Sequence, residues 1–169
     1  MGAWHDPTHV ETEDNRTAPA WPRANSAAEW VAYLCVAPLL AGLATVGLAG
    51  DYATRELAQR LTLAWGGVLL AFTGAVHWGL ALAGRLRFDA AHICGALAPA
   101  IVAAAAVAIG GQRGLALLVV GFGVFWLYEH RALAPQLPPA YLNLRRALSV
   151  AICLVLAVTM IVSDSAGLS

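Results

Sequence analysis

The chain has 169 residues, of which 60% are hydrophobic and only 12% are charged. Soluble domains are about 45–50% apolar and about 25% charged, so this charge is too low to cover the surface of a water-soluble globule. The composition excludes an ordinary soluble enzyme, a disordered chain and a disulfide scaffold. Ten arginines balance ten acidic residues and there is no lysine, so we expect the lipid bilayer, and no nucleic acid, as a partner. The sequence predicts an integral membrane protein.

Residues 1–25 are polar and include three prolines, Pro7, Pro19 and Pro22. A segment with so few apolar side chains cannot bury enough surface to offset the entropy of ordering, so we expect a disordered N-terminal tail. This segment lacks the basic start and apolar core of a cleavable signal peptide. The remaining residues, 26–169, are expected to form one transmembrane domain.

Charged residues divide this domain into uncharged runs. The runs have 21 residues between Glu29 and Asp51, 24 between Arg60 and Arg85, 23 between Asp89 and Arg113, 15 between Arg113 and Glu129, and 17 between Arg146 and Asp164. A helix needs about 20 residues to cross the hydrocarbon core, and backbone groups in lipid must bond within their own segment. The sequence therefore predicts an all-α bundle of five transmembrane helices, at about 30–50, 61–84, 90–111, 114–130 and 143–163.

The fourth run is short for a membrane span. It can cross the membrane only if Glu129 and His130, at its end, lie at the depth of the lipid headgroups or face protein instead of lipid. Both arrangements stay open at this point.

Arginines favour one side of the predicted bundle. Seven lie in the N-terminal segment, the 84–89 loop and the 131–146 connection, and three lie on the opposite side. Positively charged loops tend to stay in the cytoplasm. The bias predicts a multi-pass protein of the inner (cytoplasmic) membrane, with a cytoplasmic N-terminus and an external C-terminus.

Small residues and prolines indicate how the helices pack and bend. Helices in lipid associate by close packing, so small residues at spacings of four mark a contact face on the second span. This predicted stripe consists of Gly67, Ala71, Ala75 and Gly79. Pro38 and Pro99 lie within the first and third spans, and each removes a helical hydrogen bond, so we expect a kink at both.

His77 is the one ionisable residue well inside a predicted span. Such residues often carry function in membrane proteins; the alternative is a neutral imidazole hydrogen-bonded to a neighbouring helix, for example through Thr73. A haem between His77 and His92 would need both at one depth, and their predicted depths differ, so we expect no cofactor. The cysteines form no CxxC pair, and we expect no metal site.

Four stretches carry a likeness to a known family. They are Ala37-Pro38, Gly74-Ala75-Val76-His77-Trp78-Gly79-Leu80, Ala98-Pro99-Ala100, and Leu137-Pro138 followed by Tyr141-Leu142-Asn143-Leu144-Arg145. Over residues 30–163 the chain resembles the transmembrane protein 69-like proteins, a five-span family of unknown function. Two positions depart from the family pattern, Ala140 where it favours Trp and Glu129 where it favours Asp.

The resemblance implies the five-helix fold and a set of residues to test. The candidate functional residues are His77, Trp78, Glu129, Tyr141 and Arg145. The resemblance implies no catalytic residue and no activity. Eukaryotic members are thought of as mitochondrial, which indicates an energy-transducing membrane.

Three functions fit these observations. We expect first a non-catalytic accessory or assembly subunit of a larger, respiratory membrane complex, bound to a membrane-protein partner or to further copies of itself, because the chain is small and has no soluble catalytic domain. The second is a small transporter or channel that uses the kinked spans and His77. The third is a quinone-, lipid- or haem-handling membrane protein.

Overall fold

The computed structural model describes residues 26–84, 90–132 and 139–168. These residues form six α-helices and no strand, in the order α1 (Ser26–Leu34), α2 (Ala37–Leu48), α3 (Tyr52–Leu82), α4 (Ala90–Ile109), α5 (Gly111–Ala132) and α6 (Pro139–Ser165). The predicted tail at 1–25 and the loops at 85–89 and 133–138 lie outside the described residues. Five segments are long and apolar enough to span a membrane, with α1 and α2 together making the first. The predicted all-α, five-span bundle is confirmed.

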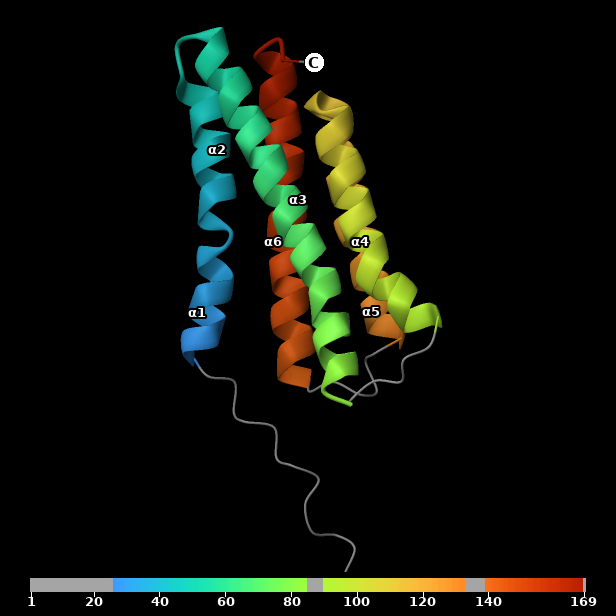
Figure 1. Cartoon of the computed structure of the whole chain (residues 1–169). Helices are drawn as coiled ribbons and strands as arrows, with labels where there is room; N and C mark the ends of the chain where they lie inside the picture. The colour runs from blue at the N-terminus through green and yellow to red at the C-terminus, as the bar shows by residue number, and fades with distance from the viewer. Residues whose placement is uncertain (1–25, 85–89, 133–138, 169) are drawn as a thin grey trace, which may run out of the picture.

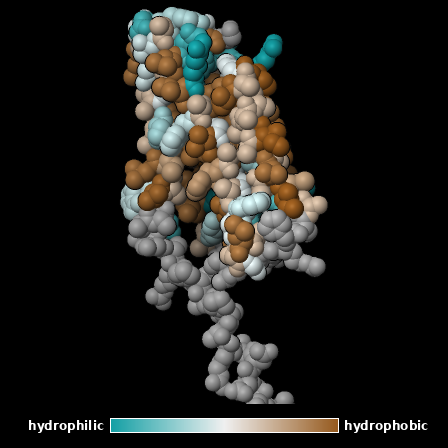
Figure 2. Space-filling model, viewed as in Figure 1, coloured by the Kyte–Doolittle hydropathy of each residue, from teal (hydrophilic) through white to brown (hydrophobic). Residues whose placement is uncertain are grey.

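The helices run side by side between two ends of the bundle (Figure 1). At the α2–α3 end the chain turns from α2 into α3, and the C-terminus lies at this end; at the α3–α4 end α3 finishes and α4 begins. The long helix α3 packs against α2, α4 and α5, whereas α1 lies at the edge and contacts little besides α6. Figure 2 shows brown, hydrophobic side chains over the flanks of the bundle, as a membrane-embedded surface requires.

The main apolar core joins five of the helices, α2 to α6. Leu39 of α2, Leu70 of α3, Leu118 of α5 and Leu156 of α6 are completely buried in it. Apolar side chains on facing helices replace contacts with lipid by tighter contacts with protein, so packing here depends on shape more than on hydrophobicity.

The first span is broken rather than kinked. The prolyl nitrogen of Pro38 has no hydrogen to donate to the carbonyl of Leu34, so α1 ends at Leu34 and α2 begins at Ala37 with Pro38 in its first turn. The indole Nε1 of Trp65 on α3 donates a 2.9 Å hydrogen bond to the carbonyl oxygen of Cys35 within the break. By contrast, α4 runs as one helix through Pro99.

Several helices extend beyond the predicted membrane runs, α3 and α6 among them. Helix α3 begins at Tyr52 instead of near 61, because Asp51 caps it: the backbone N–H of Thr54 donates a 2.8 Å hydrogen bond to Oδ1 of Asp51. Helix α6 begins at Pro139, about one turn before the predicted 143. Uncharged runs predict only the part of a helix that lies in lipid. The helix itself can continue beyond that part through turns that contain charged residues.

Small residues permit close helix contacts on α3, at some positions of the predicted stripe and at others outside it. A Cβ at Gly67 would lie 3.1 Å from Val107 of α4, so this position packs as expected. At Gly79 a Cβ would meet nothing within 4 Å, and Ala75 is also exposed. The tightest approach on α3 is at Gly74, where a Cβ would lie 2.4 Å from the carbonyl oxygen of Ala96.

Candidate functional site

Three ionisable side chains from three helices meet inside the bundle, and we call them the buried ion cluster: His77 of α3, Glu129 of α5 and Arg145 of α6. Nε of Arg145 donates a 2.8 Å hydrogen bond to Oε2 of Glu129. Nε2 of His77 lies 3.4 Å from Oε1 of the same carboxylate. His77 and Glu129 are only 1% and 2% exposed. Of the two residues at the end of the short fourth run, Glu129 therefore faces protein, whereas His130 is exposed.

Helix geometry brings this cluster together. Phe125, Tyr128 and Glu129 share one face of α5 because residues three and four apart on a helix are neighbours. The rings of Phe125 and Tyr128 flank the imidazole of His77, with centroids 5.3 and 5.8 Å away. Gly74, one turn before His77, allows α4 to approach α3 closely. These aromatic rings and the close α3–α4 contact surround the imidazole of His77.

The carboxylate of Glu129 is the centre of the cluster. A buried carboxylate is stable only with an opposite charge and hydrogen bonds, and Arg145 supplies both through a charge-assisted bond. The imidazole of His77 lies close to the free oxygen Oε1, yet neither ring nitrogen meets hydrogen-bond geometry with a described residue. Thr73, the alternative partner suggested for His77, makes no hydrogen bond with its ring in this structure, and the hydroxyl of Thr73 donates to the carbonyl oxygen of Leu70.

A cavity of about 180 Å³ lies between α1, α3 and α6, and we call it the Arg145 cavity. Its polar lining comes from Thr73, Tyr141 and Arg145, and the rest is apolar or weakly polar: Ala32, Cys35, Leu69, Phe72, Val76, Leu144, Leu148 and Ile152. Tyr141 is also near enough to Arg145 and Glu129 to interact with both electrostatically. The cavity thus has a polar wall that continues into the buried ion cluster, and an apolar body.

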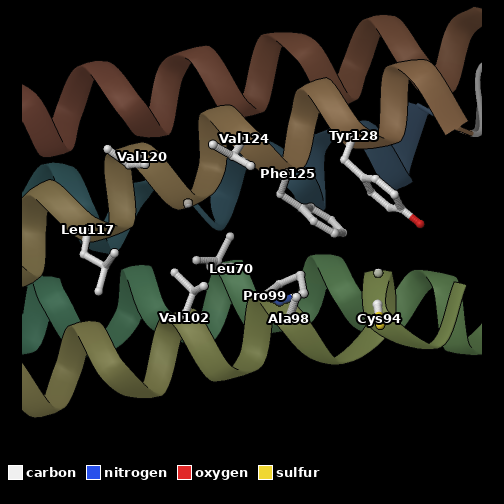
Figure 3. Close-up of a pocket in the computed structure, with 12 residues that line it drawn as sticks. Leu70, Cys94, Ala98, Pro99, Val102, Leu117, Val120, Val124, Phe125 and Tyr128 are labelled. Carbon is white, nitrogen blue, oxygen red and sulfur yellow. The ribbon is translucent and has the colours of Figure 1, made fainter. Parts of the chain in front are cut away.

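A second, wholly apolar groove of about 420 Å³ runs between α4 and α5 (Figure 3). Figure 3 shows Phe125 and Tyr128 extending from α5 towards Cys94 and Pro99 on α4. Leu70 of α3 forms its floor. The two aromatic rings separate this groove from His77, so the groove and the cluster are neighbours that do not open into each other.

The candidate residues from the sequence fall into two groups. His77, Glu129, Arg145 and Tyr141 lie together, whereas Trp78 lies beside them on the outer face of α3 and is 46% exposed. Sequence reasoning did not assign Phe125 and Tyr128 to this site. Their spacing of four and one residues before Glu129 was the available signal, since it places all three on one helix face.

No group of three or more metal-ligating side chains exists among the residues that the structure describes. His77 and His92 do line a common small space, together with Trp78. At about 10 Å³ this space has the size of a single water and cannot hold a haem.

Comparison with known proteins gives one match. No curated protein and no solved structure matches the chain. The family model described as "Protein of unknown function (DUF3429)" matches residues 24–161, which include every residue of the buried ion cluster and of the Arg145 cavity. The chain is therefore a member of the DUF3429 family of proteins of unknown function.

Proposed function

We propose that this protein is a non-catalytic, membrane-embedded binding protein that holds an amphiphilic molecule, such as a lipid or a quinone, in the Arg145 cavity. The observation that carries the proposal is the cavity itself, which joins an apolar body to a polar wall lined by Arg145, Tyr141 and Thr73. Binding sites for small molecules have this character: mostly apolar walls and a few polar groups that fix orientation.

The polar wall suits the recognition of a head group. A guanidinium offers five N–H donors and does not release its proton. In Arg145 the Nε donor is engaged by Glu129, which fixes the plane of the group and leaves the two Nη amino groups outside that pair. Tyr141, one helical turn earlier on α6, adds a hydroxyl to the same wall.

The apolar part of the cavity lies towards the lipid. Ala32 and Cys35 of the first span form one wall, and α1 contacts the rest of the bundle only weakly. A molecule with an acyl or isoprenoid tail could enter from the bilayer by displacing α1, without crossing the polar surface of the membrane.

Native mass spectrometry of the protein purified in a neutral detergent tests this proposal. The wild-type protein should carry a lipid-sized adduct, and Arg145→Gln should lose most of it. Arg146→Gln is the matched control, because Arg146 is exposed on the next position of α6 and should leave the adduct in place. A wild-type protein without any adduct, or equal adducts in both variants, would contradict the proposal.

A second candidate, an accessory subunit of a larger respiratory complex, is favoured by the surface of α1. Trp30 is 70% exposed, and Val31 and Leu34 are exposed beside it. Large aromatic side chains are typical anchors of protein interfaces. If α1 docks a partner, Trp30→Ala should release a stoichiometric partner in mild detergent, whereas Leu48→Ala, exposed on α2, should not. The respiratory setting rests on the resemblance to transmembrane protein 69-like proteins.

The proposal includes the orientation of the protein in the membrane, with the N-terminus in the cytoplasm and the C-terminus outside. The described arginines are balanced between the two ends: Arg131, Arg145 and Arg146 lie towards the α3–α4 end, and Arg55, Arg60 and Arg113 towards the other. The proposed cytoplasmic side therefore depends on the sequence, which adds four more arginines to the segments joined to the α3–α4 end. Reporter fusions at the C-terminus should behave as external, and fusions within the 133–138 connection should behave as cytoplasmic. The opposite pattern would invert the proposed topology.

A further inference from the structure

The charges of the buried ion cluster cancel in only one of its protonation states. Arg145 is always a cation, so the cluster is neutral when Glu129 is ionised and His77 is neutral. One added proton on the His77–Glu129 pair gives the cluster a net charge of +1. A net charge is costly inside a membrane unless an opposite charge lies beside it. The protonated state is therefore favoured when an anion is close.

The Arg145 cavity provides the place for such an anion. Among the described residues, its polar lining consists of Arg145, Thr73 and Tyr141 and includes no acidic residue. An anion that enters while Glu129 keeps its charge would give the site a net charge of −1. An anion that enters together with one proton leaves the site neutral.

We infer that the head group of the bound amphiphile is an anion and that its binding takes up one proton on the His77–Glu129 pair. This inference rests on the proposed function and specifies its ligand as an anionic amphiphile. We assign the proton to the pair and not to either residue, because the carboxylate oxygen and the imidazole nitrogen are only 3.4 Å apart.

The other groups around the pair support this assignment. Arg145 and Tyr141 face Glu129 from α6, Tyr128 of α5 stacks on His77, and His92 of α4 lines the small space beside His77. Among the described residues these neighbours are bases or phenols, so Glu129 is the one carboxylate of the cluster. Neutralising it leaves the charge of Arg145 available to the ligand.

The same small space indicates how the proton arrives. His77, Trp78 and His92 enclose about 10 Å³, which is room for about one water, at the α3–α4 end. His92 lies in the first turn of α4 and is only partly buried. On this inference a proton would pass from the membrane surface to His92, through this space to His77, and on to Oε1 of Glu129, which lies 3.4 Å from Nε2 of His77.

Isothermal titration calorimetry of the full-length protein in dodecyl maltoside tests the inference. The probe is hexadecyl sulfonate, which stays an anion at every pH used, and hexadecanol is its matched neutral control. Titration in two buffers of different ionisation enthalpy gives the number of protons taken up. We expect about one proton per sulfonate, none per hexadecanol, and a Kd for sulfonate that weakens about tenfold per pH unit on the alkaline side.

Variants test whether the proton is taken up by the His77–Glu129 pair or by other residues. Glu129→Gln removes the site of the negative charge, so sulfonate binding should become independent of pH and take up no proton. His130→Gln is the control, since His130 is exposed and stacks on Trp126 away from the cluster. His92→Gln should keep the proton count and slow proton uptake in stopped-flow measurements.

The calorimetric results distinguish a failure of this inference from a failure of the proposed function. Sulfonate binding without proton uptake, or equal affinities for sulfonate and hexadecanol, overturns the inference and leaves the proposed function standing. If neither probe binds at any pH, the proposed function fails and the inference fails with it. Should Glu129→Gln not fold, the proton count of the wild-type protein decides alone.

Discussion

Glu129 and Arg145 are sixteen residues apart in the sequence, on α5 and α6, and the Oε2–Nε hydrogen bond between them is 2.8 Å long. Both side chains are largely withdrawn from the surface. A charged pair in this setting contributes little net stability by itself, because desolvation offsets the attraction, but breaking it leaves a buried charge without a partner. The pair therefore fixes the relative position of α5 and α6. A substitution that removes one of the two charges should lower the stability of the fold.

The first prediction follows from this asymmetry. Glu129→Ala leaves the Arg145 guanidinium without its counter-charge and should lower the free energy of unfolding by about 3–5 kcal/mol. Reversible unfolding in mixed micelles of dodecyl maltoside and sodium dodecyl sulfate measures the change. Glu56→Ala is the control: its ion pair with Arg60 is exposed on α3, so the loss should stay under about 1 kcal/mol.

A double substitution shows whether the loss of stability in Glu129→Ala comes from the unpaired charge of Arg145 or from lost packing. Glu129→Leu combined with Arg145→Met removes both charges and keeps apolar volume in their place. Stability should recover to near the wild-type value, whereas lipid binding should be lost with Arg145. A double variant as unstable as Glu129→Ala would show that packing, and not charge, causes the loss.

Close helix contact gives the second prediction. Gly74→Ala would place a Cβ 2.4 Å from the backbone oxygen of Ala96, and backbone cannot move aside cheaply. We expect a loss of about 1–3 kcal/mol, the usual range for overpacking, measured by the same unfolding assay. Gly79→Ala on the same helix meets nothing within 4 Å and should be neutral or stabilising. Equal effects at the two glycines would contradict the α3–α4 contact.

The third prediction concerns the loss of stability at low pH. The hydrogen bond from the backbone N–H of Thr54 holds the pKa of Asp51 below its ordinary value of 3.8. Because the carboxyl pKa is lower in the folded protein than in the unfolded one, the N-cap contributes its full stability above pH 3.8 and loses it as pH falls through the folded-state pKa. Thermal unfolding between pH 3 and 6 should show this loss, and Asp51→Asn should weaken the dependence while keeping a cap.

Much of the fold could be predicted from the sequence because the membrane imposes simple constraints. Uncharged runs of sufficient length must be helices, so all five spans were expected. The sequence also singled out His77 and Glu129, but as separate features. Their contact depends on the rotation of α3, α5 and α6 about their own axes, and a single sequence does not specify that rotation. Helix ends set by Asp51 were missed for a different reason, since a charged turn does not stop a helix.

The fourth prediction concerns the break in the first span, which forms a wall of the Arg145 cavity. The carbonyl oxygen of Cys35 accepts its hydrogen bond from the indole of Trp65, because the regular helical pattern stops before Pro38. Trp65→Phe removes that donor and should cost about 1–3 kcal/mol, the penalty for an unsatisfied buried carbonyl.

A second measurement, the labelling of Cys35, tests whether Trp65→Phe opens the Arg145 cavity as well as lowering stability. Without the Trp65 bond, α1 should detach more readily, so a maleimide should label Cys35 faster in Trp65→Phe than in the wild-type protein. Trp126→Phe is the matched control, because Trp126 stacks on His130 at a distance from the break. If labelling of Cys35 is equal in all three proteins while Trp65→Phe is less stable, Trp65 stabilises the bundle without holding α1 against the cavity.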